Sequence, residues 1–229
     1  MSDVSDRIRT VSVFVFMGFL MTIGMAIGTV TSPEGGQFHE VVDPQVIIDT
    51  LVSSSPADLQ ARLIGIVLDN FFILGYLAIF YGIYLLVQNK DPFLSKFAFA
   101  FGIGTGVCDM IENAIHVALI NGIPAGWTPD PLIFVGLWSF TFIKDITSYM
   151  AGLVFVILLI LDMNKPTALR FSKIVLAILV GVYVSLGSIA IVIPSVLTIR
   201  NLSFMIDMGI GSYFMFSISR KLDPSKDGT

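Results

Sequence analysis

Six long apolar segments constrain the fold of this chain more than any other feature. They cover residues of about 11–31, 63–88, 96–121, 132–161, 172–194 and 201–218. Each is long enough to cross the roughly 30 Å hydrocarbon core of a bilayer as a helix. Only 13% of the 229 residues are charged and 55% are hydrophobic, whereas a soluble domain is about one quarter charged. We therefore expect an all-α, polytopic membrane helix bundle with six transmembrane helices, in which residues 1–229 form a single integral membrane domain.

The positive charges predict the orientation of this bundle. Ten lysines and arginines lie near segment ends on one side: Arg7, Arg9, Lys90, Lys96, Lys165, Arg170, Lys173, Arg220, Lys221 and Lys226. The opposite side has only Arg62 and Arg200. Because cytoplasmic loops carry the excess of lysine and arginine, both the N- and the C-terminus are expected to be cytoplasmic. We expect the membrane to be a bacterial plasma (inner) membrane.

The one long loop, residues 32–62, is then external. Asp43 precedes Pro44 and Ser55 precedes Pro56, which is typical of two helix starts, so the loop is predicted to contain two short helical pieces. It is either a plain connector or a lid over the bundle.

The third segment carries an unusual polar stripe. At about 100° per residue, Asp109, Glu112, Asn113 and His116 fall within an arc of roughly 100°. Ionisable side chains inside a bilayer are costly, so they mark either a functional site or a buried pairing.

Other segments carry polar side chains at a similar depth. These are Asp69 and Asn70 in the second segment, Lys144, Asp145, Ser148 and Tyr149 in the fourth, and Asp207 in the sixth. At about 1.5 Å per residue, all the ionisable groups within the segments lie between the midplane and the external surface. This coincidence predicts one shared pocket that is reached from outside. Its carboxylates outnumber its basic groups, so some must be protonated or a cation must bind.

A divalent metal is one such cation. Asp109, Glu112 and His116 lie on successive turns of one helix face, and carboxylate and imidazole ligands suit zinc, iron or manganese. We assign these three residues as metal ligands. Asp145, Lys144 and Asp69 are the candidate catalytic residues. The remaining pocket residues are Asn70, Asn113, Ser148, Tyr149 and Asp207.

Three functions fit this pocket. The first is a metal-dependent, membrane-embedded enzyme that acts on a lipid or other apolar substrate from the external side, with an acid as general base and Lys144 stabilising negative charge. The second is a proton- or cation-coupled small-molecule transporter, against which stands the absence of intramembrane charge from the cytoplasmic half. The third is a non-catalytic assembly subunit, in which the polar network only fixes helix packing. The expected partners are the lipid bilayer and the substrate, with no nucleic acid. Enzymatic activity and oligomeric state stay open.

Overall fold

The structure is a computed structural model that describes residues 2–31, 43–163 and 168–223. Within these ranges every regular element is helical. The elements are α1 (Ser2–Thr31), α2 (Pro44–Ser53), α3 (Pro56–Val87), α4 (Pro92–Gly122), α5 (Pro131–Asp162), α6 (Arg170–Val192), the short 3-10 helix η2 (Pro194–Val196) and α7 (Leu197–Leu222). The predicted all-α fold is confirmed.

Six of these helices are long and apolar enough to cross a membrane, as the sequence predicts. The largest differences lie at helix starts. The second span begins at Pro56 and not near residue 63, because Ser55 caps it and forms a reciprocal capping box with Asp58. The second helical piece expected in the long loop is therefore the first part of α3. The first piece is α2, which Asp43 caps by accepting a hydrogen bond of 2.9 Å from the Gln45 amide.

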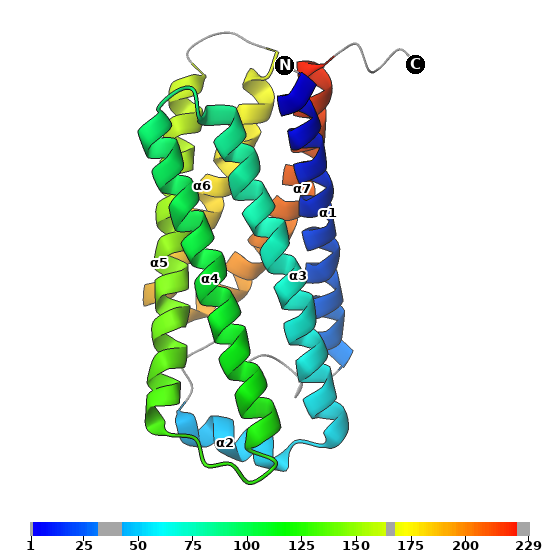
Figure 1. The fold of residues 1–229 in the computed structure, drawn as a ribbon, viewed down its shortest axis with the longest axis vertical. Helices are drawn as coiled ribbons and strands as arrows, with labels where there is room; N and C mark the ends of the chain where they lie inside the picture. Colours follow the sequence, from blue (N-terminus) through cyan, green and yellow to red (C-terminus); the bar gives the residue numbers. More distant parts are fainter. Residues whose placement is uncertain (1, 32–42, 164–167, 224–229) are drawn as a thin grey trace.

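The six long helices form a closed ring. Around the ring α1 packs on α3, α3 on α4, α4 on α5, α5 on α6, α6 on α7, and α7 again on α1 (Figure 1). The start of α1 and the end of α7 lie at the same end of the bundle, which we call the terminal end. The opposite end, where α2 lies, is the α2 end. The side of the membrane on which each end lies stays a prediction.

An apolar core fills the terminal half of the ring. Its fully buried side chains include Ile8, Ile83, Phe155, Leu158 and Ile218. Burying such side chains away from water gives each about 1.5–3 kcal/mol of stabilisation in a soluble protein, whereas in a bilayer close packing supplies most of it.

Two glycines set the closest approach between α1 and α3. A Cβ atom built on Gly75 would lie 2.7 Å from the Cα of Gly18 and 2.8 Å from the Cε of Met208 in α7. Only the absence of a side chain at both glycines allows this contact, which brings three helices together.

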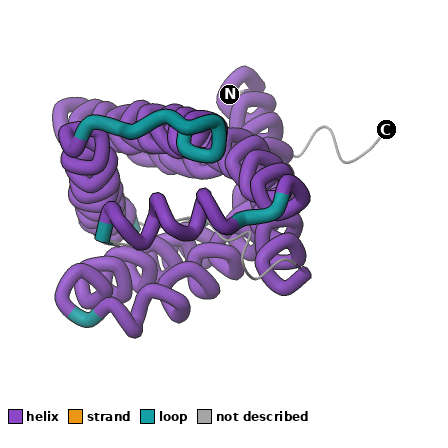
Figure 2. Tube along the Cα trace, turned by 90° about the horizontal axis from the view of Figure 1, so that it is seen from below, coloured by secondary structure: helices purple, strands orange, loops and turns teal. Residues whose placement is uncertain are grey.

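The α2 end is covered by α2 itself. Figure 2 shows α2 running across the end of the ring. Ile47 and Leu51 of α2 are fully buried in a second apolar cluster, against Leu119 of α4 and Phe134 of α5. This position is compatible with the lid that the sequence suggests, although whether α2 moves stays a prediction. The rest of the predicted loop, residues 32–42, lies outside the described residues.

The outer surface of the ring is apolar. Large side chains such as Phe14, Phe71, Phe142, Ile160 and Ile178 are exposed within the long helices. A water-soluble surface rarely presents so much contiguous apolar area, whereas lipid tails cover it without cost. The six long helices are thus those of an integral membrane protein.

Candidate functional site

A cavity of about 580 Å³ lies inside the ring and is lined by all six long helices. Five of the residues singled out from the sequence line it: Asp69, Asp109, Lys144, Asp145 and Ser148. Glu112, Asn113, His116 and Tyr149 are buried but do not belong to its lining. Predicted polar residues of three helices, α3, α4 and α5, thus line one space, which we call the central cavity.

Asp109, Glu112 and Lys144 form an ion-paired group, the acid–lysine cluster. The Lys144 Nζ atom lies 2.6 Å from Glu112 Oε2 and 3.1 Å from Asp109 Oδ1. The two carboxylates are three residues apart on α4, so they share one face and meet the lysine of α5 together. The Tyr76 hydroxyl of α3 donates a 2.9 Å hydrogen bond to the other oxygen of Asp109. The single ammonium group of Lys144 therefore forms ion pairs with two buried carboxylates.

This pairing bears on the predicted metal site. Within the described ranges, no three His, Cys, Asp or Glu side chains are grouped closely enough to hold a metal ion. His116 is buried, whereas Asp109 and Glu112 both point to Lys144. The lysine thus supplies positive charge at the position where the sequence predicts a cation. Metal binding by Asp109, Glu112 and His116 stays a prediction.

Asp69 belongs to a separate hydrogen-bonded group. The Asn113 side-chain amide donates to Asp69 Oδ2 at 2.8 Å and to Asn70 Oδ1 at 3.2 Å, which ties α4 to α3. Asp69 is buried in the cavity wall, while Asn70 is exposed. Among the ion pairs of the described residues, none includes Asp69. Its carboxylate faces the central cavity without a basic partner.

A third group surrounds Arg200. Its Nη1 atom lies 3.3 Å from Asp145 Oδ1 and donates a 2.9 Å hydrogen bond to the Tyr149 hydroxyl. Next to it, the hydroxyls of Ser148 and Tyr183 are 2.8 Å apart. Arg200, Tyr183 and Ser148 all line the cavity.

The sequence reading missed Arg200 and Tyr183. It assigned Arg200 to an external loop, which is wrong, because α7 begins at Leu197 and includes it. Pro194 is the signal that could have placed the predicted start of the sixth helix before residue 201, since proline is common at helix starts. Tyr183 carries no such signal, because a single tyrosine in an apolar helix usually belongs to the core.

Asp207 lies apart from these groups. It is not in the lining of the central cavity, and within the described part of the chain its buried Oδ2 atom has no hydrogen-bond partner. The sequence prediction that it belongs to the same pocket therefore finds no support in the geometry.

The charges around the central cavity do not balance. Among the described residues, three carboxylates line it, those of Asp69, Asp109 and Asp145, and Glu112 lies behind them in the acid–lysine cluster. The two basic groups of the lining, Lys144 and Arg200, are both paired. An ionised carboxylate without a partner is strongly disfavoured where water is scarce. The cavity is therefore suited to take up a proton or a cationic group.

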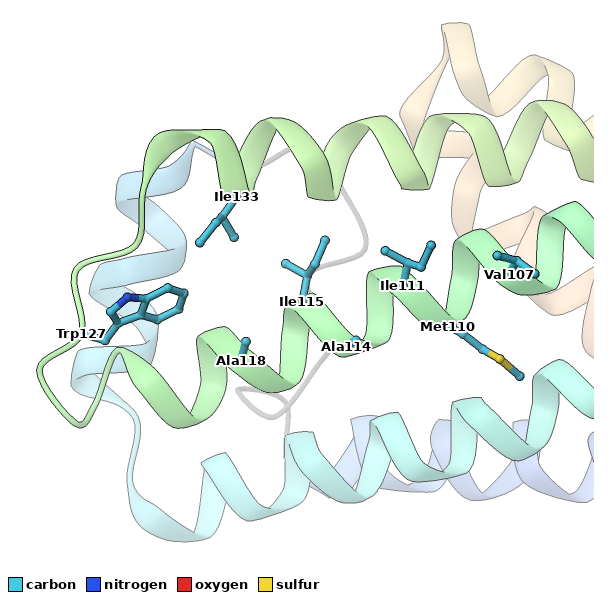
Figure 3. A pocket seen from close by; sticks show the side chains of 8 residues that line it. All are labelled: Val107, Met110, Ile111, Ala114, Ile115, Ala118, Trp127 and Ile133. Atoms are coloured by element: carbon cyan, nitrogen blue, oxygen red, sulfur yellow. The ribbon is translucent and has the colours of Figure 1, made fainter.

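A second hollow, of about 490 Å³, lies on the outside of α4 (Figure 3). Its lining is apolar apart from the Trp127 indole and includes Ile111, Ile115 and Ile133. Without a charged side chain, it adds nothing to the site's chemistry.

Comparison with known proteins adds no assignment. No protein-family model matches the chain, and neither the curated proteins nor the solved structures contain a match.

Proposed function

We propose that this protein is a membrane-embedded enzyme that transfers protons to and from a lipid or other apolar substrate in the central cavity. One observation carries the proposal: Asp69, Asp109 and Lys144 line a cavity of about 580 Å³ that lies within the membrane-spanning helices. A substrate there is surrounded by groups that exchange protons and by groups that stabilise charge.

The arrangement suggests distinct roles for these side chains. Asp69 forms no ion pair among the described residues and is the group that gives or takes the proton, as a general acid or base. Lys144 stabilises negative charge that develops on the substrate. Asp109 and Glu112 hold the Lys144 ammonium in place, and Tyr76 fixes the Asp109 carboxylate. Both Asp109 and Glu112 are therefore positioning residues.

The apolar core supports an enzyme over a transporter. Between the central cavity and the terminal end, the described residues pack as a core that includes Ile83, Phe155 and Leu158. A transported ion or proton needs polar groups along its whole path. A pocket that is closed on one side suits binding and chemistry.

The proposal is tested by lipid analysis of a host that makes the protein. We expect wild type to change the abundance of one lipid class, measured by mass spectrometry, and Asp69→Asn and Lys144→Met to leave that class as in cells without the protein. Asp49→Asn is the matched control, because Asp49 is exposed on α2 and is not part of the cavity lining. Equal lipid profiles for wild type, both variants and the empty host would reject the enzyme proposal.

The metal prediction is tested separately. A metal at Asp109 and Glu112 has to displace the ammonium of Lys144, so Lys144→Met is expected to bind metal at least as well as wild type. Elemental analysis of purified wild type, Lys144→Met and Asp109→Ala/His116→Ala measures this directly. Stoichiometric zinc, iron or manganese that only the double variant loses would support the metal site. Absence of metal from all three would reject it and leave the proton-transfer proposal intact.

A further inference from the structure

Five aromatic side chains line the central cavity together with Asp69, and four of them form a continuous series of ring contacts. Asp69, Phe72 and Tyr76 share one face of α3, at spacings of three and four residues. The ring centroid of Phe72 is 5.5 Å from that of Tyr76 and 5.4 Å from that of Phe204 in α7. The Tyr183 ring of α6 follows, 4.6 Å from Phe204. Three helices thus build one continuous aromatic wall next to a carboxylate.

This combination has a specific chemical preference. The faces of aromatic rings carry partial negative charge and attract cations, most strongly those that have lost their water. Asp69 adds a carboxylate that a bound cation would keep ionised, and neither Lys144 nor Arg200 forms an ion pair with it. Aromatic rings also offer no strong acceptor for an N–H group, so they suit an ammonium whose hydrogens are replaced by alkyl groups.

We propose that the central cavity binds the substituted ammonium group of an amphiphile, with the cationic head between Asp69 and the aromatic wall. This inference rests on the proposed role of the cavity as the substrate site, and it names the substrate class.

The remaining lining fits the apolar part of such a molecule. Beyond Asp69 toward the start of α3, the lining residues of this helix are Ala61, Ile64, Gly65 and Leu68. Ile64 and Leu202 of α7 also line the cavity; they are 53% and 54% exposed and belong to membrane-spanning helices. A hydrocarbon chain leaves the cavity there among lipid tails, while the charged head remains inside.

The test compares a cationic and a neutral amphiphile of equal chain length. Dodecyltrimethylammonium and dodecanol are titrated into purified protein in a neutral maltoside detergent, and binding is measured by equilibrium dialysis. We expect wild type to bind the cation about tenfold more tightly than the alcohol, which corresponds to about 1.4 kcal/mol. Asp69→Asn is expected to remove this preference, and Phe204→Leu to weaken cation binding several-fold. Phe171→Leu, at an exposed position of α6, is the control and is expected to bind as wild type does.

Two results would overturn the inference: equal binding of cation and alcohol by wild type, or a full preference retained in both Asp69→Asn and Phe204→Leu. If Asp69→Asn does not fold, Phe204→Leu against Phe171→Leu still decides the question. The outcome also separates this inference from the proposed enzyme. Lipid turnover without a preference for the cation would reject the substrate class alone, whereas cation binding without any lipid turnover would reject the enzyme and leave a binding protein.

Discussion

Replacement of Lys144 by methionine is expected to destabilise the protein strongly. The Lys144 Nζ atom pairs with Asp109 at 3.1 Å and with Glu112 at 2.6 Å, and the two carboxylate side chains are only 9% and 2% exposed. Methionine keeps most of the side-chain volume but removes the charge. Breaking a buried ion pair from one side costs about 3–5 kcal/mol, because the remaining charge is left without compensation. For a chain of this size, that loss corresponds to a fall in Tm on the order of 10 °C.

The same reasoning predicts a rescue. When Asp109→Asn and Glu112→Gln are added to Lys144→Met, no uncompensated charge remains, and most of the lost stability is expected to return. The free energy of unfolding is measured by titrating the detergent-solubilised protein with SDS and following helicity by circular dichroism. Lys90→Met, at an exposed lysine, is the matched control. The ion-pair reasoning is refuted if Lys144→Met unfolds within about 0.5 kcal/mol of wild type, or if the triple variant is less stable than the single one.

Three further changes test other parts of the structure. Gly75→Ala is expected to cost about 1–3 kcal/mol, since its Cβ would lie 2.7 Å from the Gly18 backbone; wild-type stability in the same SDS titration would contradict this close contact. Leu51→Ala is expected to speed amide hydrogen exchange across α2, whereas Val52→Ala, at an exposed position, is not; equal exchange in both would show that α2 is not anchored by its buried face. Asp145→Asn and Arg200→Gln are expected to be non-additive in unfolding free energy by about 0.5–3 kcal/mol, and strict additivity would mean that their contact contributes nothing.

The helices of this protein were predictable because membrane spans have a simple requirement. Each needs about 20 apolar residues, and all six segments of that kind proved helical. The starts of α2 and α3 were predictable because a helix cap depends only on neighbouring residues: Asp43 and Ser55 cap these helices as expected. What the apolar pattern could not give was the true start of α7, because Arg200 and Asn201 interrupt it. Arg200, one of the two interrupting residues, is the residue of α7 that contacts Asp145.

The candidate site was predictable in location but not in pairing. Helical spacing fixes the face on which Asp109, Glu112 and His116 lie, and all three are buried. Spacing does not say which neighbouring helix meets that face, nor how far a long side chain reaches across. Lys144 extends from α5 to both carboxylates of α4, and this contact between helices is absent from any pattern within one helix.

The position of the central cavity also determines how its affinity for a ligand has to be expressed. Ile64 and Leu202 line the cavity and are exposed within membrane-spanning helices, so a ligand that entered between them would come from the lipid phase. The quantity that governs occupancy is then the mole fraction of ligand among the lipids, and not its concentration in water. A weakly binding amphiphile that partitions strongly into the bilayer would fill the cavity, and a tighter but water-soluble ligand would leave it empty.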